Sequence, residues 1–311
     1  MSRILCTGGA GYLGSVLVPM LLAEGHAVTV VDTFAHGVPS LAGVAHKRSL
    51  TIVREDARST ATLARVREHD AVIPLAAIVG ATACDWDPIT TISLNRIAVE
   101  DIVEEARDDQ LIISPCTNSG YGLGGDAECT EDSPLQPLSL YGTSKVEAER
   151  AVLSHAGGIS LRLATLFGVS PRMRLDLLVN DLTYRAVHDR ALVLFEAGFR
   201  RNFVHVRDAA AAFLFALQHA DAMRKRAHNV GDSQANMTKR DLAGLIARIV
   251  GDVAVEEAAV DSDPDKRDYV VSNARIEALG WKPLRTLQDG IRELAQAFRA
   301  MPYRGREWRN A

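Results

Sequence analysis

The sequence contains only four cysteines, and they do not have the spacing of metal ligands. They are also too few to form a disulfide framework in a chain of 311 residues. We therefore predict no metal site, and we expect a reducing, cytoplasmic environment. The four residues are Cys6, Cys84, Cys116 and Cys129.

A surplus of positive charge is also missing. The formal net charge is −4 and no block of lysine or arginine stands out, so we expect neither nucleic acid nor an anionic membrane as a partner. The apolar stretches are short. Ala209–Ala220 makes only about three helical turns, too few to cross a bilayer. The apolar run Val16–Leu22 follows a glycine-rich segment instead of a basic one, so we predict no signal peptide.

The sequence does contain short apolar runs that alternate with helical patterns. It is 47% hydrophobic and 24% charged, which is enough apolar material for a sizeable core. Strand–helix alternation predicts an α/β fold with a Rossmann-type, doubly wound parallel sheet. The predicted strands are Arg3–Gly8, Ala27–Asp32, Leu50–Asp56, Asp70–Ala77, Gln110–Thr117 and Gly158–Gly168, and the predicted helices include Leu13–Gly25, Ala61–Glu68, Asn95–Ala106 and Tyr141–His155.

The alternation becomes irregular after about residue 170, where arginine and proline appear. This change predicts a smaller C-terminal substrate-binding domain, with the chain crossing back at least once. We assign residues 1–168 and about 203–228 to a nucleotide-binding domain. Residues from about 169 to 202 and 229–311 form the predicted second domain.

A glycine-rich segment, TGGAGYLG (Thr7–Gly14), joins the first predicted strand to the first predicted helix. Glycines at this spacing allow a tight turn, a close approach to a pyrophosphate and close helix–strand packing. The helix N-terminus then offers free N–H groups to the phosphates. Asp32 ends the second strand, where its carboxylate can accept both ribose hydroxyls and repel a 2′-phosphate, so NAD is favoured over NADP. The alternative is a purely structural turn. Asp56 ends the third strand and either faces the adenine or is a solvated strand end.

Tyr141 and Lys145 are four residues apart in a predicted helix, so their side chains can address one site. The pKa of a phenol is near ~10 and must be lowered by about 3 units before the group can act as a base at neutral pH. One cation about 4 Å away supplies roughly 4 kcal/mol at an effective dielectric constant of ~20, but burial acts in the opposite direction. The positive nicotinamide of NAD would complete the shift. Taken alone, such a pair is more often simply exposed on a helix surface.

Together with ISPCTNSGYG (Ile113–Gly122), these motifs resemble the extended short-chain dehydrogenase/reductase family, and within it the nucleotide-sugar epimerases and dehydratases. The resemblance covers nearly the whole chain. It implies that Tyr141 is the catalytic base and acid, that Lys145 holds the ribose and lowers the tyrosine pKa, and that Thr117 hydrogen-bonds the reacting sugar oxygen. The implied NAD-binding residues are Gly8, Gly11, Tyr12, Leu13, Gly14, Asp32, Asp56, Ala57, Leu75, Ala76, Ala77, Tyr141 and Lys145.

The second half of the chain resembles the substrate-binding half of the same family. Arg201 and Arg267 match arginines that grip the substrate diphosphate, and their alternative is a surface salt bridge. Asn180 is a weaker match to a substrate-contacting asparagine, and either Arg172 or Arg174 could face the substrate. The resemblance also implies a homodimer through the helices near Asn95–Ala106 and Tyr141–His155. The predicted substrate-binding residues are Asn118, Ser119, Asn180, Arg174, Arg201 and Arg267.

Asn118 and Ser119 narrow the predicted reaction. In the resembling 4,6-dehydratases an aspartate and a glutamate stand at these two positions, and neither Asn118 nor Ser119 can act as a general acid near neutral pH. The 3,5-epimerases have a cysteine where Ser119 stands. Reversible oxidation of a sugar alcohol remains, so we predict a nucleotide-sugar epimerase, most readily at C4. The open alternatives are a dehydrogenase or ketoreductase that does not epimerise its nucleotide sugar, and a non-catalytic NAD-binding protein.

Overall fold

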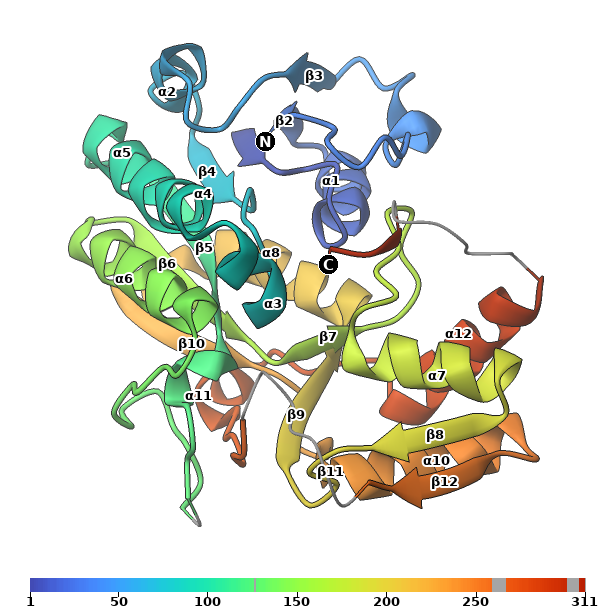
Figure 1. The fold of residues 1–311 in the computed structure, drawn as a ribbon. Coiled ribbons are helices and arrows are strands. Elements are labelled where there is room, and N and C mark those ends of the chain that lie inside the picture. The colour runs from blue at the N-terminus through green and yellow to red at the C-terminus, as the bar shows by residue number, and fades with distance from the viewer. Residues whose placement is uncertain (126, 259–266, 301–307, 311) are drawn as a thin grey trace.

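A seven-stranded sheet forms the centre of the computed structural model, which describes residues 1–125, 127–258, 267–300 and 308–310 (Figure 1). Its strand order is β10-β6-β5-β4-β1-β2-β3, and every neighbouring pair is parallel. The order reverses beside β1, which is the topological switch point of a doubly wound sheet. The strands are β1 (Arg3–Thr7), β2 (Ala27–Asp32), β3 (Leu50–Arg54), β4 (Ala71–Pro74), β5 (Leu111–Thr117), β6 (Gly158–Leu163) and β10 (Arg226–Val230).

Helices cover both faces of this sheet, as β1 illustrates. Ile4 and Cys6 are buried in a core that includes residues of α1 and α8, whereas Leu5 between them is buried against α2 and α5. Alternate side chains of a strand point to opposite faces, so a strand that is buried on both faces has a continuous apolar sequence. The predicted α/β, Rossmann-type fold is confirmed. The helices concerned are α1 (Gly14–Ala23), α2 (Thr60–Val66), α5 (Ala98–Glu105), α6 (Leu140–Ser154), α8 (Val206–Gln218) and α9 (Ala220–Met223).

The predicted strand Gly158–Gly168 is divided in the structure. Its first part is β6, and its second part, β7 (Thr165–Phe167), pairs with β9 in a separate three-stranded sheet. At the break, the Ala164 amide donates to the carbonyl of Val230 over 2.9 Å. The apolar run is continuous through this position, so its composition does not reveal where the neighbouring strand changes. The remaining strands are β8 (Ala191–Leu194), β9 (Arg200–His205), β11 (Asn236–Thr238) and β12 (Ala254–Glu257).

The predicted helix Asn95–Ala106 begins earlier than expected. Pro88 occupies its first turn and the Asp87 carboxylate accepts a hydrogen bond from the Thr90 amide over 3.0 Å, a usual N-terminal cap. The helical stretch then includes one π-helical turn before α5. The segments between β4 and β5 are α3 (Ala81–Trp86), α4 (Pro88–Ile92) and the π-helical turn η2 (Ser93–Ile97).

A second core lies to the right of the three-stranded sheet in Figure 1 and is built mainly from three helices. Residues of α7, α10 and α12 pack there with Phe203 of β9 and Leu192 of β8. The division of the chain into two domains stays a prediction. Among the residues that the structure describes, no helix has the length and apolar character needed to cross a membrane. The other helical segments are η1 (Ala42–Val44), η3 (Asn118–Tyr121), α7 (Leu178–His188), α10 (Lys239–Val250), α11 (Ala274–Ala278) and α12 (Leu287–Ala300).

Candidate functional site

The glycine-rich turn between β1 and α1 is packed so closely that side chains are excluded. Gly8 has a φ of +70°, and a Cβ there would lie 2.5 Å from the backbone nitrogen of Ala76. A Cβ on Gly14 would lie 2.6 Å from the carbonyl oxygen of Gly9, and one on Gly9 would lie 2.8 Å from Val30. Because these positions carry no side chains, the backbone of the turn lies against the end of β4 and leaves the N-terminus of α1 accessible. This is the geometry that a dinucleotide pyrophosphate requires.

Asp32 supports this turn from the end of β2. One carboxylate oxygen accepts the amide of Ala10 over 2.9 Å, and the other accepts the amide of Phe34 over 2.8 Å. Each oxygen of an ionised carboxylate retains a further acceptor site. The side chain can therefore hold the turn and still accept ribose hydroxyls.

A cavity of about 440 Å³ opens from the glycine turn toward the ends of β5 and α6. Its volume lies in the usual range for a small-molecule site, about 300–1,000 Å³. Most of the predicted site residues line it. These are Gly8, Gly11, Tyr12, Leu13, Gly14, Leu75, Ala77, Thr117, Tyr141, Lys145, Arg174, Arg201 and Arg267.

The other predicted residues lie behind or beside the cavity wall. Asp56 forms an ion pair with Arg58 over 2.7 Å, its side chain is 36% exposed, and Arg58 holds the carboxyl pKa below its usual value. These contacts are those of the strand-end alternative, and contact between Asp56 and adenine stays a prediction. The residues that are not part of the cavity lining are Asp32, Asp56, Ala57, Ala76, Asn118, Ser119 and Asn180.

Asn95 positions the segment that follows β4. Its side chain is fully buried, accepts the amide of Ile78 over 2.8 Å and donates to the carbonyl of Ile78 over 2.8 Å. It also donates to the hydroxyl of Ser144, one residue before Lys145, over 3.3 Å. The π-helical turn thus ties the segment after β4 to the helix that carries Tyr141 and Lys145. Such turns are frequent at functional sites.

Thr117 ends β5 and caps the short helix that follows. Its hydroxyl accepts the amide of Ser119 over 3.1 Å and lies 2.9 Å from the Ser119 hydroxyl. Arg267 donates to that same serine hydroxyl over 2.8 Å, and Arg201 donates to the carbonyl of Arg267 over 2.9 Å. The two arginines and the Thr117 hydroxyl therefore belong to one connected group. Asn118 is buried, and its side-chain amide makes no hydrogen bond to the described part of the chain.

Tyr141 and Lys145 lie on the same side of the first turns of α6. Ser139 caps this helix by accepting the amide of Gly142 over 3.2 Å. Burial raises the pKa of Tyr141 to about 12, and the positive charges of Arg174 and Arg267 oppose that rise. Burial also lowers the pKa of Lys145. The protein alone thus keeps the phenol protonated, so a further positive charge is needed beside it to make it a base near neutral pH.

Asn180 holds other residues of the site in place. Its carbonyl oxygen accepts the amide of Gly168 over 3.0 Å, and its amino group donates to the carbonyl of Arg174 over 2.8 Å and to the Tyr12 hydroxyl over 3.4 Å. Arg174 forms an ion pair with Asp176. These contacts orient Arg174 and Tyr12, and direct contact of Asn180 with a substrate stays a prediction.

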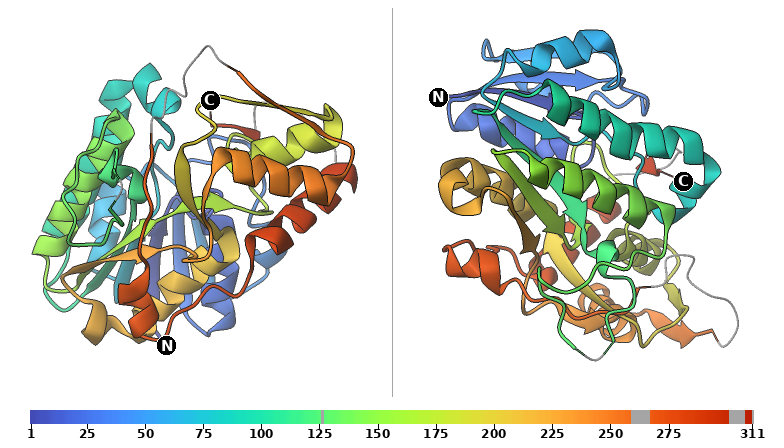
Figure 2. Two further views of the ribbon diagram at one scale, coloured as in Figure 1. Left: turned by 90° about the horizontal axis from the view of Figure 1, so that it is seen from below. Right: turned by 90° about the vertical axis from the view of Figure 1, so that its left-hand side faces the viewer.

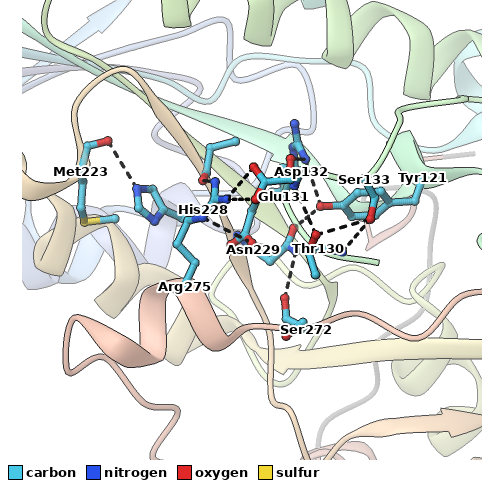
Figure 3. A network of polar contacts seen from close by, with 12 residues as sticks. Tyr121, Thr130, Glu131, Asp132, Ser133, Met223, His228, Asn229, Ser272 and Arg275 are labelled. Atoms are coloured by element: carbon cyan, nitrogen blue, oxygen red, sulfur yellow. Dashed lines mark hydrogen bonds and ion pairs between the residues drawn. The ribbon is translucent and has the colours of Figure 1, made fainter. Parts of the chain in front are cut away.

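A buried polar network lies beside the Thr117 turn (Figure 3). The Tyr121 hydroxyl donates to Asn229 over 2.7 Å, and the backbone amide of Asn229 donates to Glu131 over 2.8 Å. Arg162 donates to the Tyr121 hydroxyl over 3.0 Å and forms an ion pair with Glu149 over 2.7 Å, with both charged side chains at most 6% exposed. The network links the turn to β6, β10 and the helix α6.

Several cavity residues were missed by the sequence analysis. Thr165 in β7 lines the cavity, and its buried hydroxyl has no partner among the described residues. Thr165 reaches the cavity wall because β7 leaves the main sheet, and the sequence does not show this step. Val79 and Gly80 also line the cavity, and they end the segment Pro74–Gly80 that resembles the family's cofactor-facing stretch. No sequence signal pointed to several further lining residues, among them His36, Ala81, Thr82, Ala83 and Asn310.

The fold and the site define a dinucleotide-binding protein with a Thr–Tyr–Lys group at the reacting end of its cleft. The sequence profile of the NAD dependent epimerase/dehydratase family matches residues 4–231, and the chain belongs to this family. It is therefore an NAD-dependent enzyme of the nucleotide-sugar epimerase/dehydratase type.

Relatives within the family differ in the reaction they catalyse. The chain is 26% identical to a UDP-glucose 4-epimerase of Corynebacterium glutamicum, with 95% of each sequence covered. It is 27% identical to UDP-glucuronic acid decarboxylase 1 of Xenopus tropicalis, over 96% of this chain and 72% of that protein. It is also similar to the crystal structure of a UDP-glucose 4-epimerase of Thermus thermophilus in complex with NAD, with a TM-score of 0.81 and 27% identity over 96% of this chain and 99% of that one.

The residues of the cleft fit the cofactor that the family uses. The close packing at Gly8 and Gly14 leaves the backbone of the glycine turn accessible to a pyrophosphate. Asp32 would accept the adenosine ribose hydroxyls, and Tyr141 and Lys145 would contact the nicotinamide ribose. When bound, NAD accepts a hydride and can return it.

Proposed function

We propose that this protein is an NAD-dependent nucleotide-sugar 4-epimerase. The main support is the group formed by Thr117, Tyr141 and Lys145, in a site where Asn118 and Ser119 stand after the threonine. This group can move one proton to and from a sugar oxygen, but Asn118 and Ser119 supply no acid or base for the loss of water. The relative from Corynebacterium glutamicum, a UDP-glucose 4-epimerase, supports the same reaction.

The proposed reaction uses each of these residues in a defined role. The Tyr141 phenolate removes the proton from the C4 hydroxyl while the hydrogen on C4 leaves as hydride, which converts that carbon to a ketone. Thr117 donates a hydrogen bond to the oxygen and keeps it in place. After the keto sugar rotates within the site, hydride is returned to the opposite face of the same carbon. The Tyr141 phenol returns the proton to the oxygen. Lys145 stabilises the phenolate throughout.

Arg201 and Arg267 would bind the diphosphate of the substrate. Both line the cavity, and each guanidinium can donate several charge-assisted hydrogen bonds. Arg267 also donates to Ser119, which lies 2.9 Å from the catalytic hydroxyl of Thr117. Binding of the diphosphate would therefore be coupled to the position of the threonine that contacts the sugar.

The test is proton NMR of the purified protein with a panel of nucleotide sugars in D₂O and no added cofactor. We expect a new anomeric signal that grows to equilibrium with one or a few UDP sugars. No solvent deuterium should enter the sugar, because the hydride returns to the carbon that released it. Accumulation of a keto sugar with NADH, only when NAD is supplied, would replace the proposal with the dehydrogenase. Release of carbon dioxide or water would instead identify a decarboxylase or a dehydratase.

We also propose that the protein is a homodimer. The helices α5 and α6 lie side by side on one face of the molecule (Figure 2). The segments that precede α5 leave large apolar side chains exposed, with Ile89 at 82% and Trp86 at 71%. A second copy of the chain would cover them. Light scattering should give twice the chain mass of 33.7 kDa, and substitution of Ile89 by glutamate should shift it toward the monomer. A monomeric wild-type protein at micromolar concentration would contradict the proposal.

A further inference from the structure

Arg172 has an unusual position in the loop between β7 and α7. Its side chain is only 1% exposed, and it lines the same cavity as the glycine turn. Its backbone amide donates to the hydroxyl of Ser15, in the first turn of α1, over 3.4 Å. Ser15 also lies 2.9 Å from the hydroxyl of Ser170. These contacts hold the backbone of Arg172 next to the N-terminal turn of α1.

No ion pair between Arg172 and a carboxylate is present in the described part of the chain, although the charges of Asp176 and Asp32 act on it from a distance. One terminal nitrogen donates to the carbonyl of Met173 over 3.2 Å, and the other donates to Asn310 over 2.8 Å and to the carbonyl of Arg309 over 3.4 Å. The Nε atom is buried and has no hydrogen-bond partner among the described residues. Burial lowers the pKa of Arg172 to about 10, so the side chain remains positive at neutral pH. A buried cation with only neutral acceptors is costly to the protein, and an anionic ligand would remove that cost.

The contacts of Arg172 place it in the part of the cavity next to the glycine turn. Its backbone is bonded to the first turn of α1 through Ser15, and its side chain lines the same cavity as Gly11, Gly14 and His36. The charge of Arg172 also helps burial to lower the pKa of His36. Asp32 is the candidate for the adenosine ribose and Tyr141 for the nicotinamide ribose. The group between those two riboses in NAD is the pyrophosphate.

We propose that Arg172 binds the pyrophosphate of NAD, on the side opposite the glycine turn. The turn contributes backbone N–H groups and the helix N-terminus, and Arg172 contributes a guanidinium whose Nε has no acceptor in the described ranges of the chain. Phosphate oxygens would replace the neutral acceptors from Arg309 and Asn310. This assignment differs from the expectation that Arg172 faces the substrate, because Arg201 and Arg267 lie together elsewhere in the cavity. It rests on the NAD dependence of the family and not on the proposed epimerase activity.

The test is the binding of NAD to the full-length protein, measured by calorimetry without any sugar and after removal of retained nucleotide. We expect Arg172→Met to weaken the binding of NAD and of ADP-ribose by about 10- to 100-fold, as for the loss of a charge-assisted contact. The affinities for adenosine and for UDP should be unchanged, because neither carries this pyrophosphate. Arg172→Lys should lie between the two, because it keeps the charge and loses the planar fork.

Thermal unfolding separates this role from a structural one. The ligand-free Arg172→Met protein should have a Tm no lower than the wild type, because the variant removes a buried cation that has no ion-pair partner among the described residues. The rise in Tm on adding NAD should be largely lost. Arg292→Met, an exposed arginine on α12, removes the same charge and should retain the wild-type response. The proposal is overturned if the affinity for NAD is unchanged, or if the affinity for UDP falls and that for NAD does not. It is also overturned if the affinities for NAD and adenosine fall equally while the ligand-free Tm is lower.

Discussion

Tyr141→Phe is expected to lower kcat by about 100-fold or more. The variant keeps the ring and its packing but removes the phenol that we propose carries the proton of the sugar hydroxyl, and loss of a general base costs about 10²–10⁴ in rate. The affinity for NAD should change little. Steady-state kinetics on the substrate found by NMR, together with calorimetry of NAD binding, will check both statements.

The pH dependence of the same variant provides a second readout. Burial raises the pKa of Tyr141 to about 12, whereas Arg174 and Arg267 lower it. Because oxidation of the sugar needs the phenolate, kcat of the wild type should rise with pH until the phenol is ionised in the cofactor complex. The Phe variant should lack this rise. Tyr184→Phe is the matched control, because Tyr184 on α7 packs against Phe298 of α12 and is not part of the cavity lining. A Tyr141→Phe enzyme with near-wild-type kcat would refute the proposed mechanism.

Arg162→Met is expected to produce the largest loss of stability, about 3–5 kcal/mol in the free energy of unfolding. Arg162 donates to both carboxylate oxygens of Glu149, to the Tyr121 hydroxyl and to the carbonyl of Glu131. The hydroxyl of Ser160 also donates to Glu149 over 2.6 Å. Removal of the guanidinium leaves the Glu149 carboxylate buried without its ion-pair partner. Urea-induced unfolding, followed by circular dichroism, will measure the effect.

Two further variants test the cause of that loss. Arg3→Met breaks an ion pair with Asp70 whose side chains are 62% and 44% exposed, and it should cost less than about 1 kcal/mol. The double variant Arg162→Met, Glu149→Leu should recover part of the stability, because it removes both buried charges. If Arg162→Met is no more harmful than Arg3→Met, the buried network does not stabilise the fold as we describe.

The first half of the chain was predictable because its strands and its glycine turn are determined mainly by local sequence. The strand Ala27–Asp32 was predicted with the boundaries that the structure shows, since a strand buried on both faces is apolar throughout. The glycine spacing identified the turn because sterics permit no other residue at Gly8. The family, the fold and the use of NAD followed from these features together with the Tyr–Lys spacing, and the comparisons confirm them.

The second half of the chain depends on contacts between distant segments, which a single sequence does not show. The chain leaves the main sheet at Ala164 without any change in composition, and this step places Thr165 in the cavity wall. The burial of Arg172 results from packing of residues 308–310 against the loop after β7. Asp56 has the spacing of a cofactor ligand, but its local pairing with Arg58 could be recognised only from coordinates.

The hydrogen bond from Arg267 to Ser119 joins positions that are 148 residues apart, and this has a consequence for how such enzymes diverge. In the proposed site, a late segment of the chain would position the hydroxyl group beside the sugar, whereas a helix in the middle of the chain would carry out proton transfer. Replacements near Arg267 can therefore alter which sugar is accepted and leave Tyr141 and Lys145 intact. A lineage could acquire a new substrate through changes in its last fifty residues while it inherits the old chemistry unaltered.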